Sequence, residues 1–173
     1  MNQESNINEK QEIDESNFIE NIEEHQYLTF LLCGEVFAIE ILNINEIISY
    51  QPVATVPHMP DFVKGVMNIR GNVVPVVSLG KRLGLGEQPI TKKSATIIIE
   101  NDKDDDEDMS IGLLVDVVNE VFDILPDKIE QTPSFGTKIR SDFIKKIGKV
   151  DGKFISILNL DTILDIHDLS MSY

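Results

Sequence analysis

The chain has 173 residues and a formal net charge of −15 at pH 7. This length suits one ordinary domain, or two small barrels that share a core, and is too short for a multidomain enzyme. The negative charge disfavours nucleic acid and anionic lipid as partners, because both are polyanions. The chain has no basic leader, no apolar segment long enough to insert into a membrane, and one cysteine, Cys33. We therefore expect a soluble cytoplasmic protein without an internal disulfide or a thiolate metal site.

The acidity is concentrated in two segments. Residues 1–25 hold eight acidic residues and one lysine, and residues 101–108 hold six acidic residues and one lysine. The first segment is polar throughout, which predicts an acidic disordered tail over 1–25. The remainder predicts a folded domain over 26–165 and a short C-terminal tail over 166–173.

From residue 27 onward, β-branched and aromatic runs are broken by Gly, Pro and Asn, which is typical of strands. Tyr27–Cys33 and Val36–Leu42 predict a hairpin around a Gly34-Glu35 turn of type II′. The apolar spacing in Asn43–Ser49 fits either a short helix or a bent strand.

The next elements are a helical turn, a strand and a short helix. Asp61 is a candidate N-cap for a helical turn over Phe62–Met67. Val73–Leu79 predicts a strand, in which Pro75 implies an edge position or a bulge because it has no N–H. Lys81–Leu85 predicts a short helix that ends at a glycine.

The second half of the chain repeats the first. Aligning Val36–Ser49 with Ser110–Asp123 places Asn45-Glu46 on Asn119-Glu120, and aligning Lys64–Leu83 with Lys145–Leu164 places Gly71 on Gly152. The predicted strands of the second half are Ala95–Glu100, Ser110–Val117, Val121–Leu125 and Lys153–Leu158. The pattern predicts a mainly β fold of two small, mostly antiparallel barrels packed together, with short helices and a seam where a partner can dock.

Enzyme chemistry has little support in the sequence. Asp102, Asp104, Asp106 and Asp108 have the spacing of a calcium loop, but Glu107 and Leu113 stand where a Gly and a Glu are needed. The common nucleotide and hydrolase motifs are absent. We therefore expect no enzyme, no cofactor and no metal site, with an Asp-rich metal-dependent hydrolase as the enzyme alternative.

The segment Asn68-Ile69-Arg70-Gly71 is the strongest candidate for partner recognition. One interpretation is a solvated charge beside a residue with positive φ. The other is a rigid turn that presents Arg70 as a bidentate anchor for a partner carboxylate, which the guanidinium fork suits better than an ammonium group does.

The chain resembles the CheW family of bacterial chemotaxis adaptors over about Tyr27 to Asp165. The matching segments are Val36–Ile39, Ile44–Ile47, Val56–Gly71, Val73–Val77, Gly112–Val118 and Gly148–Gly152. The resemblance implies a pair of five-stranded SH3-like barrels. Ser78 stands where many family members carry Asp at a helix cap, a position that Ser can also fill.

The same resemblance implies a non-enzymatic adaptor that couples methyl-accepting chemoreceptors to the histidine kinase CheA. One barrel would dock the regulatory domain of CheA, and the groove between the barrels would receive the cytoplasmic tip of the receptor. The motifs assign partner contacts to Ile44, Glu46, Gly65, Arg70 and Gly71, without deciding which partner each contacts. The protein would be cytoplasmic and associated with membrane receptor arrays through its partners. The alternative is an adaptor of a related array that controls surface motility or second-messenger synthesis.

Overall fold

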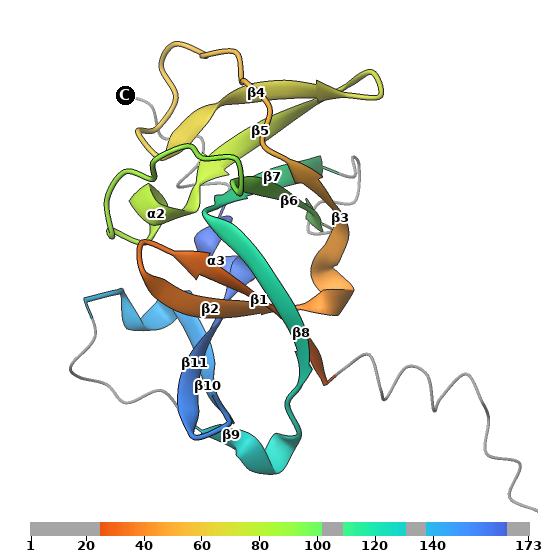
Figure 1. Cartoon of the computed structure of the whole chain (residues 1–173). Coiled ribbons are helices and arrows are strands. Elements are labelled where there is room, and N and C mark those ends of the chain that lie inside the picture. Colours follow the sequence, from red (N-terminus) through yellow and green to blue (C-terminus); the bar gives the residue numbers. More distant parts are fainter. Residues whose placement is uncertain (1–24, 102–108, 131–137, 166–173) are drawn as a thin grey trace, which may run out of the picture.

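The computed structural model describes residues 25–101, 109–130 and 138–165, which form two β-sheets (Figure 1). The six-stranded sheet has the order β8-β1-β2-β11-β10-β9, and the five-stranded sheet has the order β3-β6-β7-β5-β4. The strands are β1 Gln26–Leu32, β2 Glu35–Glu40, β3 Ile44–Ser49, β4 Val63–Ile69, β5 Asn72–Ser78, β6 Ala95–Asn101, β7 Met109–Val115, β8 Val117–Asp123, β9 Ile129–Glu130, β10 Ile144–Val150 and β11 Lys153–Leu158. The helices are η1 Ile41–Asn43, α2 Leu79–Arg82, η2 Pro126–Lys128, η3 Ser141–Phe143 and α3 Leu160–Ile163.

Each sheet combines strands from both copies of the sequence repeat. β4, β5 and α2 of the first copy correspond to β10, β11 and α3 of the second. Yet β5 pairs in parallel with β7, and β11 pairs in parallel with β2, so each hairpin joins strands from the other half of the sequence. Each sheet therefore contains both halves of the chain, and neither barrel corresponds to one sequence half.

Each sheet curls into a small barrel, which confirms the predicted mainly β fold. In the five-stranded barrel the edge strands are β3 and β4, and the segment between them forms a bridge from Ala54 to Val66 on β4. In the six-stranded barrel the edge strands are β8 and β9, which residues 124–128 connect. The two-residue strand β9 accounts for the sixth strand of this sheet.

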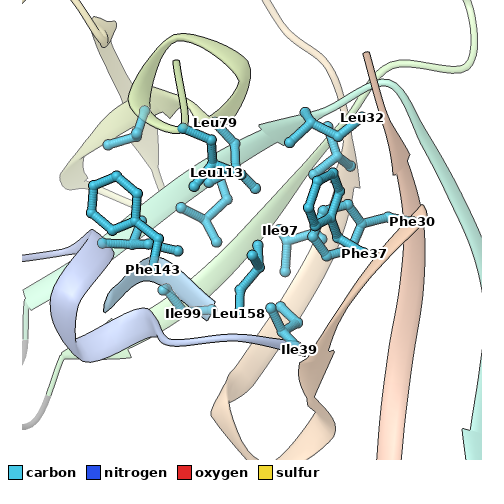
Figure 2. Packing of buried hydrophobic residues seen from close by; sticks show 14 of the residues in the cluster. Phe30, Leu32, Phe37, Ile39, Leu79, Ile97, Ile99, Leu113, Phe143 and Leu158 are labelled. Atoms are coloured by element: carbon cyan, nitrogen blue, oxygen red, sulfur yellow. The ribbon is translucent and has the colours of Figure 1, made fainter. Parts of the chain in front are cut away.

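A central hydrophobic core lies between the barrels (Figure 2). It joins Phe30 and Phe37 of the six-stranded barrel, whose rings stack with centroids 6.4 Å apart, to Ile97, Ile99 and Leu113 of the five-stranded barrel. All five side chains are at most 1% exposed. Burial of apolar area on this scale is the main term that stabilises the fold.

Each barrel also has its own smaller core, because successive side chains of a strand point to opposite faces of the sheet. On β6, Ile97 and Ile99 enter the central core whereas Ile98 packs inside the five-stranded barrel. On β2, Phe37 enters the central core whereas Ala38 packs inside the six-stranded barrel. Neighbouring side chains of one strand therefore belong to two different cores.

Two local predictions in the first half were wrong. The first hairpin turns at Cys33-Gly34, one residue earlier than predicted, and both residues have positive φ (50° and 84°), which defines type I′ rather than II′. Phe62–Met67 is not a helical turn, since it lies mostly in β4, where Val63, Gly65 and Met67 are buried in strand alternation. The ambiguous segment Asn43–Ser49 is mostly the strand β3.

Two further predictions need correction. Pro75 lies on the interior strand β5, neither at an edge nor at the register shift, which falls between Val63 and Gly65 of β4. Proline is tolerated there for two reasons. The N–H and the carbonyl of its partner Val66 both form hydrogen bonds with Ala54, so neither needs Pro75. On the other side, the pairing with β7 begins only at Val76. The short helix α2 starts at Leu79, two residues before the predicted start.

A buried amide organises the start of α2. Gln88 is 3% exposed, and its Oε1 accepts hydrogen bonds from the Ser78 hydroxyl (3.1 Å) and the Gly80 N–H (2.9 Å). Its Nε2 donates to the Leu114 carbonyl (3.0 Å) and to Asp116 Oδ1 (2.9 Å). Ser78 occupies the N-cap position without making a side-chain cap bond, so Gln88 supplies the acceptor that the first turn needs.

The same network reaches the first hairpin. Asp116 Oδ2 accepts a hydrogen bond from the Cys33 N–H at 2.8 Å. Burial, together with the carboxylates of Asp116 and Glu35, raises the pKa of the Cys33 thiol. Cys33 is therefore a half-buried, protonated thiol at the junction of the barrels.

Arg82 connects the two copies of the repeat at the helices α2 and α3. Its guanidinium lies 4.6 Å from the ring of Phe62 and 4.9 Å from that of Phe143, two residues at equivalent places in the repeat. Its Nε and Nη2 also donate to the carbonyls of Ile163 and Thr162 at the end of α3. A planar cation can stack on rings and donate at its edge in this way, so Arg82 joins α2 to α3.

We expect Gly65→Ala to destabilise the fold by about 1–3 kcal/mol, because overpacking against backbone forces the strand to move. A Cβ at Gly65 would lie 2.4 Å from the carbonyl oxygen of Ala54. The comparison variant is Gly71→Asn, at a turn position with φ of 85° where a Cβ meets nothing within 4 Å and where Asn is tolerated. Urea unfolding followed by circular dichroism measures both, and an equal loss of stability in the two variants would contradict this account.

Replacing the buried amide tests its capping role. Gln88→Ala should lower the free energy of unfolding by about 2–3 kcal/mol, because the Gly80 N–H and the Leu114 carbonyl lose their buried partner. Gln51→Ala, at an exposed site, should change the stability by less than about 0.5 kcal/mol. If thermal unfolding gave the same midpoint for both variants, Gln88 would have no capping role.

Candidate partner-binding site

The predicted Arg70-Gly71 turn joins β4 to β5. Arg70 and Gly71 both have positive φ (50° and 85°), and the Gly71 N–H donates to Asn68 Oδ1 at 2.9 Å. The Arg70 side chain is 75% exposed. The turn is thus held by local hydrogen bonding and projects the guanidinium into solvent.

Arg70 contacts a carboxylate of its own chain. Its Nη2 donates to Glu46 Oε2 on β3, at 2.5 Å. Because β3 and β4 are the two edge strands of the five-stranded sheet, this ion pair joins the two edges beside the β4–β5 turn. We call this end of the barrel its mouth. Exposed ion pairs contribute less than about 1 kcal/mol, so a partner carboxylate can replace Glu46 at little cost.

The other candidate residues have different environments. Gly71 is exposed beside Arg70, whereas Gly65 is buried under the segment that contains Ala54 and offers no surface to a partner. Ile44 is half-buried and packs against the central core. The structure therefore brings Glu46, Arg70 and Gly71 together at one barrel mouth, whereas Gly65 lies buried against Val53 and Ala54.

Two exposed apolar side chains on the outer face of this barrel were not singled out in the sequence. Ile47 follows Glu46 on β3 and is 43% exposed, and Val73 lies near the turn on β5 and is 68% exposed. Strand alternation was the signal that could have identified them, because their neighbours Ile48 and Val74 pack inside the barrel.

The predicted seam is a cleft between the two barrels. A cavity of about 210 Å³ is bounded by Glu40 and Lys145 of the six-stranded barrel and by Ile99 and Glu100 of the five-stranded barrel. Lys145 and Glu40 form an ion pair at 2.7 Å on the six-stranded side of this cavity. A second cavity of about 150 Å³ shares Glu100 and is lined by Ile44, so this residue faces the seam.

The polar side chains of the described ranges form no metal centre. Within residues 25–101, 109–130 and 138–165, no three His, Cys, Asp or Glu side chains are grouped so that they could hold a metal ion. The Asp102–Asp108 segment lies outside these ranges. Among the helices of the described residues, none has the length and apolar character needed to cross a membrane.

Comparison with known proteins identifies the family. The model of the CheW-like domain matches residues 26–167. The chemotaxis protein CheW of Thermotoga maritima is 32% identical over 147 residues, covering 83% of this chain and 90% of that protein. The chemotaxis protein CheW of Bacillus subtilis is 31% identical over 138 residues, covering 80% and 85%.

A solved structure agrees with these relatives. The crystal structure of the scaffolding protein TtCheW of Thermoanaerobacter tengcongensis superposes with a TM-score of 0.75 at 31% identity, covering 86% of this chain and 92% of that one. These findings confirm the predicted resemblance and the prediction of a non-enzymatic chemotaxis adaptor. The chain belongs to the CheW family of chemotaxis scaffold proteins.

Proposed function

We propose that this adaptor couples the cytoplasmic tips of chemoreceptors to the regulatory domain of the histidine kinase CheA. The observation that carries the proposal is the Arg70 turn on a CheW scaffold, where an exposed guanidinium is held by one replaceable carboxylate. The protein acts in the cytoplasm and reaches receptor arrays through its partners.

The contacts proposed for partners are Arg70, Gly71, Glu46 and Ile44, with Gly65 shaping the strand beneath them. Arg70 supplies a bidentate donor for a partner carboxylate, and the exposed side chains of Ile47 and Val73 supply apolar area on the outer face of the same barrel. Ile44 faces the inter-barrel seam, which is a separate surface. An adaptor needs two such surfaces in order to hold two partners at once.

Removing the guanidinium tests the site. Arg70→Ala should weaken binding of a partner by about 1–3 kcal/mol, or about 5- to 150-fold in dissociation constant, while the fold is retained, since Arg70 is exposed. Lys92→Ala removes an exposed cation from a loop outside the site and should leave the affinity unchanged. Titration calorimetry with the CheA regulatory domain, and separately with a receptor-tip fragment, gives the affinities.

Glu46→Ala belongs in the same experiment. If Glu46 orients Arg70 for its partner, the double variant should lose less binding free energy than the two single losses added together. Wild-type affinity of Arg70→Ala for both partners would show that the site is wrongly assigned.

A further inference from the structure

The six-stranded barrel carries a groove that the proposed function does not use. Its volume is about 670 Å³, and residues of β1, β2, β8 and the β10–β11 hairpin line it. The groove lies on the opposite barrel from Arg70, so an inference about it does not depend on the proposed function.

The groove has an apolar lining. Phe154 is 62% exposed and Val36 is 41% exposed, whereas Phe122 and Val150 are half-buried and pack against the core of the barrel. An exposed aromatic ring beside aliphatic side chains is typical of a protein-binding surface. The Lys149 ammonium lies 5.8 Å from the Phe154 ring centre, so the face of this ring is already next to a cation.

The rim of the groove is acidic. Glu35, Glu120 and Asp151 line it, and Lys153 is the one cation among its lining residues. Within the described part of the chain, none of the three carboxylates forms an ion pair. The Thr29 hydroxyl donates to the backbone carbonyl of Glu120 at 2.7 Å, which fixes the strand while leaving the carboxylate to face the groove.

The sequence repeat explains why this mouth is open. The alignment that relates the two halves places Glu120 on Glu46 and Asp151 on Arg70. In the five-stranded barrel these positions hold the ion pair that crosses the mouth. In the six-stranded barrel they hold two carboxylates, which cannot form that ion pair. An arginine of a partner can pair with both, and Lys153 is the one cation of the lining that competes for them.

We propose that this groove docks a partner segment in which an arginine lies between apolar side chains. The arginine would pair with Glu120 and Asp151, as Arg70 pairs with Glu46 in the other barrel, and the apolar side chains would cover Phe154 and Val36. The chain's own N-terminal segment does not suit the groove, because residues 1–25 carry eight acidic residues and one lysine.

The test uses the full chain, isotope-labelled, titrated with a short peptide of alternating leucine and arginine. We expect changes in backbone amide shifts at Asn119, Asp151 and Phe154, and none with the same peptide carrying glutamate in place of arginine. The double variant Glu120→Gln with Asp151→Asn should weaken peptide binding by about tenfold. Asparagine tolerates the positive φ of Asp151 (49°), so the turn is retained.

Two controls make the result specific. Asp127→Asn removes a carboxylate from an exposed site of η2 outside the groove, and Asp61→Asn removes one from an exposed site before β4, so both should leave peptide binding unchanged. Shifts outside the groove, no binding, or equal binding by the double variant would overturn the proposal. Self-association in sedimentation experiments that the double variant abolishes would also overturn it, since the occupant would then be a second copy of this chain.

Discussion

The central core between the barrels depends on the exchange of hairpins between the two sequence halves. The parallel pairings of β5 with β7 and of β11 with β2 bring each hairpin onto the other half of the chain, and only then do Phe30, Phe37, Ile97 and Leu113 meet. Parallel, long-range pairing is costly in chain entropy, and the burial of this core offsets that cost. The two barrels therefore form one folding unit.

That unit holds the proposed partner surfaces at fixed positions. Gln88 and Asp116 connect α2 to the first hairpin, and Arg82 connects α2 to α3, so polar contacts reinforce the apolar junction. The two equivalent mouths differ in charge. One mouth carries the Arg70–Glu46 pair, and the other carries Glu120 and Asp151. One mouth thus carries a neutral ion pair, whereas the other is acidic.

Much of the fold could be predicted from the sequence, because its signals are local. Period-two alternation located most strands, and β11 has the predicted bounds Lys153–Leu158. The helical turn predicted at Phe62–Met67 was wrong because Asp61 resembled a cap while the alternation of Val63, Gly65 and Met67 is that of a strand. The exchange of hairpins has no local signal in the sequence. A hairpin has the same strands and turn whether it pairs with its own half of the chain or with the other half.

The candidate site was predictable only residue by residue. Arg70 and Glu46 were both expected to meet partners, yet their mutual contact depends on the closure of the barrel, which brings edge strands together. Conversely, the acidic groove was implicit in the repeat, because the same alignment places Asp151 on Arg70. Its significance appears only once the structure shows what the pair does in the other barrel.

On the proposed function, one rigid two-barrel body holds two partners at the same time. Sedimentation velocity of the labelled protein, mixed with a receptor-tip fragment and the CheA regulatory domain, detects such a complex. We expect a ternary complex that sediments faster than either binary complex. Displacement of one partner by the other would contradict it, because a shared surface cannot couple a receptor to a kinase.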